Sequence, residues 1–346
     1  MNSNDLNIAI VGATGAAGGT AVKLLLERDH PAEKIRVMAS ERSAGRKIPY
    51  GEVELTVIRA TPEAFEGIDA ALFAAGGLVS KRLAHKAVER GVFVIDKGSI
   101  FRMDPNIPLV VPEVNSDDIE WHPGIVSTPN CTTTPLVMVL DALRKLSPVK
   151  AVTVATYQAA TGTGVAANEE LIEQSRTVLM GGEAKPEVYP HIIAFNVFPQ
   201  VDDFLENGYT KEEQKMLNES RKILHDDHLP ISATCVRVPV EISHSESVQI
   251  EFESSVSVED ALRVLDDYDG VRVVDDPGQN QYPMPLEATG KDDVLVGRIR
   301  KDIAHEHGLV LWLSCDNLRK GAALNALQIL DEALRRDAFR PAAQRN

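Results

Sequence analysis

The first 130 residues alternate short apolar runs with segments of helical periodicity. Leu6–Val11 is typical of a buried strand, and the apolar residues of Ala16–Arg28 and Ser80–Arg90 recur at the spacing of one helix face. Further strands are expected at Ile35–Ala39, Ala70–Ala75, Val92–Asp96 and Ile125–Thr128. Strands that alternate with helices in this way predict an α/β fold, with a parallel sheet and right-handed crossovers.

The middle of the chain has a different pattern, in which apolar and polar residues alternate along half-buried strands. Such strands are expected at Ala151–Gln158, Ile231–Val240, Ser247–Ser254, Val271–Val274, Val294–Arg300 and Leu309–Ser314, with helices at Lys211–Leu224 and Val258–Tyr268. They predict an α+β domain with a mostly antiparallel sheet. A long helix at Leu318–Arg336 is expected to pack back on the first domain, which gives domains of 1–130 plus 316–346 and of 131–315.

Length and composition narrow the class of protein. A chain of 346 residues with 44% hydrophobic and 25% charged residues is long enough for about two globular domains. The net charge of −15 argues against nucleic acid or an anionic membrane as the main partner. The apolar runs are shorter than the roughly 20 residues of a membrane span, and the start of the chain does not look like a signal peptide. We therefore expect a soluble, cytoplasmic protein.

A glycine-rich turn follows the first expected strand. Its residues are Gly12, Ala13, Thr14, Gly15, Ala16, Ala17 and Gly18. Glycine is needed where the backbone turns tightly or lies close to a pyrophosphate, and the N–H groups at the start of the next helix face that anion. The turn predicts a dinucleotide site, and a plain packing turn is the alternative.

The end of the second strand bears on the choice of cofactor. Ser40, Arg42 and Ser43 supply two hydroxyls and a guanidinium, which suit the 2′-phosphate of NADP. Glu41 is the type of residue that binds the ribose hydroxyls of NAD. The pattern favours NADP, while NAD and a simple solvated loop stay open.

Cys131 is the candidate nucleophile. It stands between an expected strand and an expected helix that runs to about Leu146, and the first turn of a helix favours a thiolate. Cys235 and Cys315 lie inside strand patterns, where a small buried side chain is the default, and the spacing of the three cysteines fits neither a disulfide framework nor a zinc site. A thiolate beside a nicotinamide implies addition to an aldehyde, hydride transfer and release of a thioester.

That chemistry requires a proton shuttle. His244 is the best candidate among nine histidines, because it ends an expected strand in a hydroxyl-rich turn; a turn histidine without a catalytic role is the alternative. His305 and His307 are close together, but no third ligand accompanies them, so no metal is predicted.

The chain resembles the aspartate-β-semialdehyde dehydrogenase family in blocks that follow one another over nearly its whole length. The blocks are the glycine-rich turn, Ser-Ala-Gly at 43–45, Phe-Arg-Met-Asp at 101–104, Val-Val-Pro-Glu-Val-Asn at 110–115, Pro-Asn-Cys-Thr at 129–132, Thr-Tyr-Gln-Ala at 156–159, His-Ser-Glu at 244–246, and the segments 194–202, 206–213, 233–240 and 316–325. An ordered set of this kind is much more specific than any single motif.

The resemblance implies a Rossmann-type NADP-binding domain, completed by the C-terminal helix, and a central α+β domain for catalysis and dimerisation. It implies the reversible, NADP-dependent conversion of L-aspartyl 4-phosphate to L-aspartate 4-semialdehyde and phosphate, on the route to lysine, methionine and threonine. The assembly it implies is a homodimer or a dimer of dimers.

The resemblance also implies roles for the matching residues. The catalytic residues are Cys131 as nucleophile and His244 as acid/base. The substrate-binding residues are Gln158 for the intermediate, Arg237 for the α-carboxylate, Glu212 for the α-amino group, and Lys215, Arg102 and Asn130 for the phosphate. The cofactor-binding residues are those of the glycine-rich turn with Ser40, Arg42, Ser43 and Asn317. Residues 212 and 215 are three apart in an expected helix, which places both on one face, although a solvated helix has the same spacing.

The chain departs from the family pattern at Lys97, where the family commonly has Asn, and at Thr161 and Thr163, where it has Ser and Ala. Lys97 is a candidate for added charge at the phosphate site. One alternative activity is that of N-acetyl-γ-glutamyl-phosphate reductase, which has no free α-ammonium group to bind and so no need of Glu212. The other is a catalytically silent dinucleotide sensor, against which the presence of both Cys131 and His244 argues.

Overall fold

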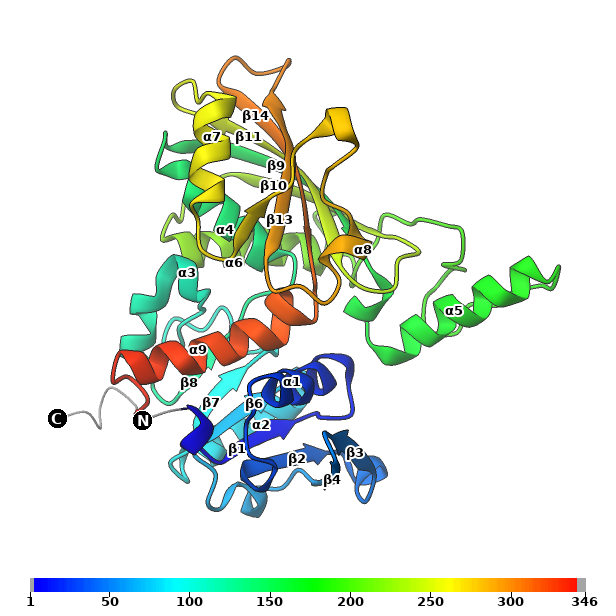
Figure 1. Ribbon diagram of the computed structural model, residues 1–346, viewed down its shortest axis with the longest axis vertical. Coiled ribbons are helices and arrows are strands. Elements are labelled where there is room, and N and C mark those ends of the chain that lie inside the picture. The colour runs from blue at the N-terminus through cyan, green and yellow to red at the C-terminus, as the bar shows by residue number, and fades with distance from the viewer. Residues whose placement is uncertain (1–2, 341–346) are drawn as a thin grey trace. The chain divides into compact units, whose positions relative to one another are not determined.

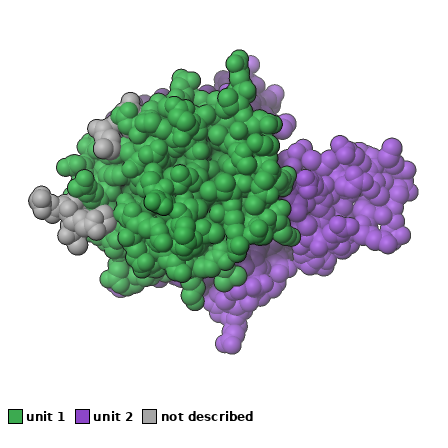
Figure 2. All heavy atoms as spheres, turned by 90° about the horizontal axis from the view of Figure 1, so that it is seen from below, with its two compact units in different colours: residues 1–130, 322–346 green, residues 131–321 purple. Residues whose placement is uncertain are grey.

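The computed structural model describes residues 3–340, and the chain divides into two compact units (Figures 1 and 2). Unit 1 comprises Met1–Asn130 and Ala322–Asn346, and unit 2 comprises Cys131–Gly321. Residues 341–346 of the first expected domain lie outside the described part. In the described residues, no helix combines the length and the apolar composition that crossing a bilayer requires.

Unit 1 contains a six-stranded parallel sheet in the order β5-β2-β1-β6-β7-β8. Its strands are β1 (Ile8–Val11), β2 (Ile35–Ala39), β5 (Ile58–Arg59), β6 (Ala70–Phe73), β7 (Phe93–Asp96) and β8 (Ile125–Ser127). Its helices are α1 (Ala16–Glu27), α2 (Gly77–Val88), α3 (Pro112–Asn115) and α9 (Leu324–Arg335), and β3 (Lys47–Tyr50) pairs with β4 (Val53–Thr56) in a hairpin. The predicted α/β architecture is confirmed.

Both faces of this sheet are buried, because successive side chains of a strand point to opposite faces. Ile8 and Ile10 of β1 pack in one apolar cluster that includes residues of α1 and α9. Ala9 and Val11 pack in a second cluster, with residues of α2. The chain leaves β1 for β2 on one side and later adds β6 on the other, so the strand order reverses beside β1. Ligands of open parallel sheets bind at the carboxyl ends of the strands at such a point.

Unit 2 contains a six-stranded mixed sheet in the order β10-β9-β11-β14-β13-β12. Its strands are β9 (Val149–Gln158), β10 (Ile231–Arg237), β11 (His244–Phe252), β12 (Val271–Val273), β13 (Val294–Lys301) and β14 (Gly308–Cys315). The three central pairs are antiparallel, as expected, whereas the outer pairs β10–β9 and β12–β13 are parallel. The sheet is therefore mixed and mostly antiparallel, in agreement with the expectation.

Helices cover one face of the mixed sheet. The helices of unit 2 are α4 (Thr133–Arg144), α5 (Val165–Leu179), α6 (Lys211–Leu224), α7 (Val258–Asp266) and α8 (Pro285–Ala288). Helices α4, α6 and α7 lie on one side of the sheet, and α5 extends away from it (Figure 1). Residues on the other face stay partly exposed, including Thr153 and Tyr157 of β9.

Several helix boundaries differ from the sequence-based expectation, such as those of α2 (Gly77–Val88, expected at 80–90), and two of the differences have an identifiable form or cause. Helix α4 begins at Thr133, with Thr132 as its N-cap, so Cys131 lies just before the helix and not in its first turn. The reason is Pro135, which has no N–H to donate to the Cys131 carbonyl, so the helix starts one residue later with the Leu136 N–H bonded to the Thr132 carbonyl. The final helix begins as a π-helical turn, Arg319–Ala323, before α9.

Candidate active site

The glycine-rich turn of unit 1 requires glycine at two of its positions. Gly12 has a φ of +94°, and a Cβ added there would lie 2.8 Å from the Ala74 carbonyl carbon. A Cβ at Gly18 would overlap the Gly12 carbonyl oxygen. The turn is thus packed directly against α1 and the end of β6, at the reversal of the strand order.

A cavity of about 340 Å³ opens beside this turn. It is lined by Gly12, Thr14 and Gly15 of the turn, by Ser40 at the end of β2, and by Arg82 of α2, among others. A groove of glycine and small residues with exposed helix N–H groups fits a dinucleotide. The residues of unit 1 by themselves therefore fit a bound dinucleotide.

The residues expected to bind a 2′-phosphate are only partly gathered at this cavity. Ser40 lines it, whereas Arg42 and Ser43 do not. Glu41 is held away from it by an ion pair with Arg59, at 2.9 Å. Arg82 supplies a guanidinium that sequence reasoning missed, because nothing in the spacing of α2 shows which of its residues faces β2.

Unit 1 also contains Arg102 and Asn130, both buried. Arg102 donates from Nη2 to the Lys97 carbonyl oxygen at 2.7 Å. The turn that carries Lys97 is fixed by Asp96, which accepts from Ser80 Oγ at 2.6 Å and from the Gly98 N–H at 3.0 Å. Burial raises the pKa of Asp96 above its ordinary value, and the bonds from Ser80 and Gly98 oppose that shift. Lys97, the departure from the family pattern, is thus adjacent to Arg102 through its backbone.

Unit 2 brings Cys131 and His244 together. The Sγ of Cys131 lies 3.3 Å from Nε2 of His244, although 113 residues separate them in the chain. His244 is buried at the start of β11, and Cys131 is partly exposed. The predicted pairing of a thiol with a histidine is present in the geometry.

The other nitrogen of His244 has a backbone partner. The Ala159 N–H donates to Nδ1 at 3.0 Å. Because a backbone N–H can only donate, Nδ1 is the acceptor and the neutral ring carries its proton on Nε2, toward the sulfur. The ring is thus arranged to donate a hydrogen bond to Sγ.

Gly162 lies against two of the expected site residues at once. A Cβ there would be 3.0 Å from Cε1 and 3.1 Å from Nε2 of His244, and 3.1 Å from Nη1 of Arg237. The imidazole and the guanidinium therefore both border the space left by one absent side chain. Sequence reasoning did not single out Gly162, although it belongs to the Thr161–Gly164 segment that was compared with the family.

Arg237 is a buried cation with no ion-pair partner among the described residues. It is 4% exposed, and its Nη1 donates to the Ala159 carbonyl at 2.6 Å and more weakly to that of Gln158 at 3.5 Å. Within residues 3–340 its Nε has no acceptor, and its guanidinium lies over the Tyr189 ring at 5.5 Å. A buried guanidinium of this kind is poised for an anion, because its charge is uncompensated.

A chain of polar contacts extends from the sheet to α6. Gln158 accepts from Thr156 Oγ1 at 3.1 Å and donates to Oε1 of Glu212 at 3.0 Å. Oε2 of Glu212 accepts from Lys215 Nζ at 3.0 Å. The predicted helix is present with the expected limits, its capping box is formed by Thr210 and Glu213, and the i, i+3 spacing does place both charges on one face.

The strand ends explain why these residues meet. Arg237 and Gln158 end the parallel strands β10 and β9 and are paired in register, while His244 begins the antiparallel neighbour β11. Three side chains from distant segments thus share one end of the mixed sheet. Periodicity located these strands approximately, but it began β11 at Ser247 and placed His244 at the end of a strand, whereas His244 is the first residue of β11. The pairing that aligns the strand ends is tertiary.

Asn317, expected to bind the cofactor, is engaged within unit 2. Its Oδ1 accepts from the Ser243 N–H at 2.8 Å, and its Nδ2 donates to Thr161 Oγ1 at 3.2 Å. Ser243 has a left-handed φ of +76°, so Asn317 helps to hold the strained residue before His244. The hydroxyl of Thr163 accepts from Tyr189 at 3.0 Å. Both departures from the family pattern in this loop therefore make hydrogen bonds.

Cys235, Cys315 and His305 differ from Cys131 and His244 in their surroundings. Cys235 and Cys315 are buried, and burial raises the pKa of both thiols. His305 bonds to Asp302 at 2.9 Å. Within residues 3–340, no group of His, Cys, Asp or Glu side chains is arranged to hold a metal ion.

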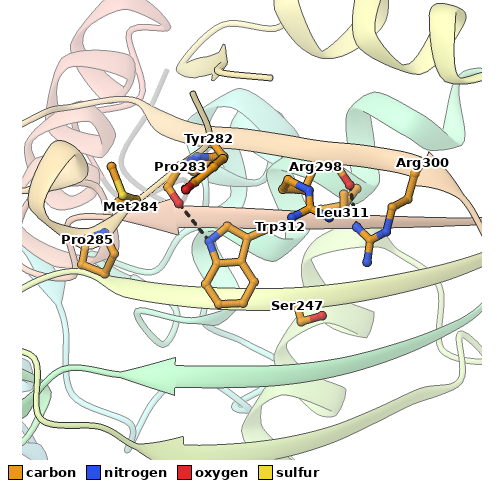
Figure 3. Close-up of a pocket in the computed structure, with 9 residues that line it drawn as sticks. All are labelled: Ser247, Tyr282, Pro283, Met284, Pro285, Arg298, Arg300, Leu311 and Trp312. Carbon is orange, nitrogen blue, oxygen red and sulfur yellow. Dashed lines mark hydrogen bonds between the residues drawn. The ribbon is translucent and has the colours of Figure 1, made fainter. Parts of the chain in front are cut away.

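A second cavity, of about 290 Å³, lies on the opposite face of the mixed sheet (Figure 3). Trp312, whose indole donates to the Pro283 carbonyl at 3.1 Å, and Ser247 form part of its lining. Ser247 is three residues from His244 on β11, and side chains an odd number apart point to opposite faces. This cavity is therefore separate from the Cys131–His244 pair.

Comparison with protein families assigns both parts of the chain. Residues 7–122 match the model described as semialdehyde dehydrogenase, NAD binding domain, and residues 140–320 match semialdehyde dehydrogenase, dimerisation domain. A similar protein is the aspartate-semialdehyde dehydrogenase of Bacillus subtilis, 48% identical over 94% of this chain and 96% of the relative. That of Aquifex aeolicus is 49% identical over the same shares. The chain belongs to the aspartate-semialdehyde dehydrogenase family.

Solved structures agree with membership in the aspartate-semialdehyde dehydrogenase family. Aspartate semialdehyde dehydrogenase II from Vibrio cholerae, also determined in complex with ASA, has a TM-score of 0.91 and 40% identity over 95% of this chain and 98% of that one. The Candida albicans enzyme with NADP has a TM-score of 0.75 and 25% identity, over 96% and 99%. The expected family, its NAD(P)-binding domain and its oxidoreductase class are thus confirmed.

Proposed function

We propose that the chain catalyses the reversible, NADP-dependent conversion of L-aspartyl 4-phosphate to L-aspartate 4-semialdehyde and phosphate, in the pathway to lysine, methionine and threonine. The observation that carries this proposal is the 3.3 Å contact between Cys131 Sγ and His244 Nε2. Within a semialdehyde dehydrogenase, a thiol bonded to an imidazole is the group that forms and breaks the thioester.

In the direction of semialdehyde oxidation, the Cys131 thiolate adds to the aldehyde carbon and the carbonyl oxygen becomes an alkoxide. The Nε2–H of His244 donates to the sulfur before this addition and to the alkoxide after it. NADP held by the glycine-rich turn of unit 1 would supply the acceptor for the hydride that leaves that carbon. A phosphate oxygen then attacks the resulting thioester, the carbon–sulfur bond breaks, and aspartyl phosphate leaves while the thiolate is restored.

The substrate would be bound by the charged groups of unit 2. Arg237 suits the α-carboxylate, because its buried guanidinium has no counter-ion among the described residues. Glu212 suits the α-ammonium group, and Gln158, which donates to Glu212, orients the intermediate. Lys215, Arg102 and Asn130 would bind the phosphate, with charge from Lys97 in support. Glu212 separates this reading from N-acetyl-γ-glutamyl-phosphate reductase, whose substrate has no free ammonium to bind there.

Unit 1 would bind NADP. The glycine-rich turn, from Gly12 to Gly18, would hold the pyrophosphate. Ser40, Arg42 and Ser43 would bind the 2′-phosphate, and Asn317 is proposed to contribute from unit 2. We assign unit 1 as the cofactor domain and unit 2 as the catalytic and dimerisation domain.

The same family membership supports a homodimer formed through unit 2, which we extend to a dimer of dimers in the cytoplasm. The uncovered face of the mixed sheet is the surface for a second copy, because it carries the exposed Tyr157 and the half-buried Trp312, whose tilted rings have centroids 5.0 Å apart. Neither nucleic acid nor a membrane is among the proposed partners.

The decisive experiment measures NADPH formation from aspartate semialdehyde with and without phosphate. Wild-type protein should show phosphate-dependent turnover, and Cys131→Ala should abolish turnover while NADP binding stays. N-acetylglutamate semialdehyde serves as the competing substrate. Full activity of Cys131→Ala, or preference for the acetylated substrate, would contradict the proposal.

A further inference from the structure

Lys215 lies between two carboxylates. Its Nζ is 3.0 Å from Oε2 of Glu212 and 2.7 Å from Oδ2 of Asp202. Glu212 is on the same helix, whereas Asp202 is in the loop that precedes α6. Of the three residues, only Asp202 has no role in the proposed reaction.

The charges of this cluster do not suit an anion. Two carboxylates and one ammonium sum to −1, although Lys215 is proposed to bind phosphate, which is an anion. Both oxygens of Glu212 are already used, by Gln158 and Lys215, and the substrate ammonium would add a further positive charge beside them. The carboxylate of Asp202 is therefore the excess negative charge at the phosphate site.

Lys215 and Asp202, which form the shorter of the two ion pairs, are both charged at neutral pH. Partial burial acts to raise the pKa of Asp202, but the bond from Lys215, the bond from the Asp203 N–H and the charge of Lys215 together outweigh it, and the net pKa lies below the ordinary value. Burial acts to lower the pKa of Lys215, and the charges of Glu212 and Asp202 reverse this, so that its pKa is raised. An incoming phosphate thus meets a fully formed ion pair.

Asp202 can give up Lys215 at small cost. One third of its side chain is exposed, so its carboxylate can turn to water. Its other oxygen, Oδ1, accepts from the Asp203 N–H at 2.9 Å, which keeps the loop in place whichever partner Oδ2 has.

We propose that Asp202 competes with phosphate for the Lys215 ammonium and so sets the affinity of the enzyme for phosphate. On phosphate binding, a phosphate oxygen takes the place of Asp202 Oδ2 on Nζ. The inference rests on the proposed function. Within that function, Asp202 is a residue that weakens the binding of anions. Weaker binding lets the product acyl phosphate dissociate. Asp202 is thus a residue that tunes substrate affinity, not a catalytic one.

The test is Asp202→Asn, assayed by NADPH formation with phosphate varied at saturating semialdehyde and NADP. The backbone of Asp202 is left-handed, with a φ of +68°, and Asn tolerates that region, so the loop should be kept. The KM for phosphate should fall by about three- to tenfold, the effect of removing one unit charge a few ångströms from an anion in a partly solvated site. The KM values for semialdehyde and NADP should change less than about twofold.

Asp203→Asn is the matched control. Asp203 is the next residue, and its carboxylate is paired with Lys211 at 2.6 Å instead of Lys215. The Asp203→Asn variant removes the same net charge from the same loop but leaves the Asp202–Lys215 ion pair in place. Its KM for phosphate should therefore stay at the wild-type value. A fall of equal size in this variant would mean that general charge, not Asp202, controls anion affinity.

A second variant keeps the test independent of the Asn side chain. Asp202→Gly suits the left-handed backbone and also removes the carboxylate, so it should lower the phosphate KM as Asn does. An unchanged or raised phosphate KM in both active variants would overturn the proposal and make Asp202 an orienting partner of Lys215. Wild-type protein without phosphate-dependent turnover would instead refute the proposed function.

Discussion

The backbone N–H of Ala159 donates to Nδ1 of His244, and this bond determines what the imidazole can do. With Nδ1 as acceptor at 3.0 Å, the neutral ring presents a proton from Nε2 to Cys131 Sγ, 3.3 Å away. A ring in this tautomer stabilises a thiolate, and then an alkoxide, by donation. The residue that fixes it contributes only its backbone.

Replacing His244 tests whether donation is the important property. His244→Ala should lower kcat by about 10²–10⁴, the usual contribution of a positioned proton donor or acceptor. His244→Gln should recover part of that loss, because its amide N–H can reach toward Sγ. The comparison is made by steady-state kinetics, with NADP binding as the folding control. A Gln variant no faster than Ala would show that a base, and not a donor, is needed.

Gly162 should be intolerant of even one methyl group. A Cβ at 3.0–3.1 Å from the His244 ring and Arg237 Nη1 must push one of them aside. Gly162→Ala should therefore lower kcat by about ten- to a hundredfold, because small displacements of reacting groups are costly. It should also slow alkylation of Cys131 at neutral pH.

Gly278→Ala is the control for this substitution, because a Cβ there meets only the exposed Asp276 side chain, at 3.3 Å, and its φ is not left-handed. Its kcat and alkylation rate should equal those of the wild type. If kcat and the alkylation rate fell equally in both alanine variants, Gly162 would have no special role.

The three cysteines should differ sharply in reactivity. Cys235 and Cys315 are buried, and burial raises the pKa of both thiols, so both stay protonated and inaccessible near neutral pH. Iodoacetamide should add one carbamidomethyl group per native chain, at Cys131, as measured by intact mass. Cys131→Ser should add none. After unfolding in denaturant, wild-type chains should add three.

Glu246 should make the protein less stable as the pH rises. It is fully buried on β11, neither carboxylate oxygen has a hydrogen-bond partner among the described residues, and burial raises its pKa well above the ordinary 4.5. The folded chain keeps this proton where the unfolded chain loses it, so stability is full below about pH 4.5 and declines above it.

Glu246→Gln should flatten that decline and have the higher Tm at pH 8, by a few degrees, as measured by calorimetry from pH 5 to pH 8. Glu251→Gln, on the same strand, is the control. The bond from Lys150 lowers the pKa of Glu251, so its contribution is present above the ordinary value and is lost on acidification. If the Tm of the wild type rose between pH 5 and pH 8 as much as the Tm of Glu246→Gln, the expectation would be contradicted.

Local sequence located most strands of the two six-stranded sheets and singled out Cys131 as the candidate nucleophile. The segment 211–224 was expected as a helix with the limits that α6 has, because its amphipathic face lies in the segment itself and its N-cap, Thr210, directly precedes it. Cys131 was recognisable because it stood between a strand and a helix. The start of α4 was nevertheless expected too early, at Cys131, although Pro135, which delays the start, can be read from the sequence.

Tertiary structure alone decided what surrounds the sulfur. The Ala159 N–H, the space at Gly162 and the ion pair of Asp202 with Lys215 have no signature in periodicity or composition. Each depends on strand register or on how a loop meets a helix, and these follow from packing over many residues. The sequence determined which chemical groups the protein has, while the fold determined their distances and proton positions, because contacts between distant segments are set by the whole core.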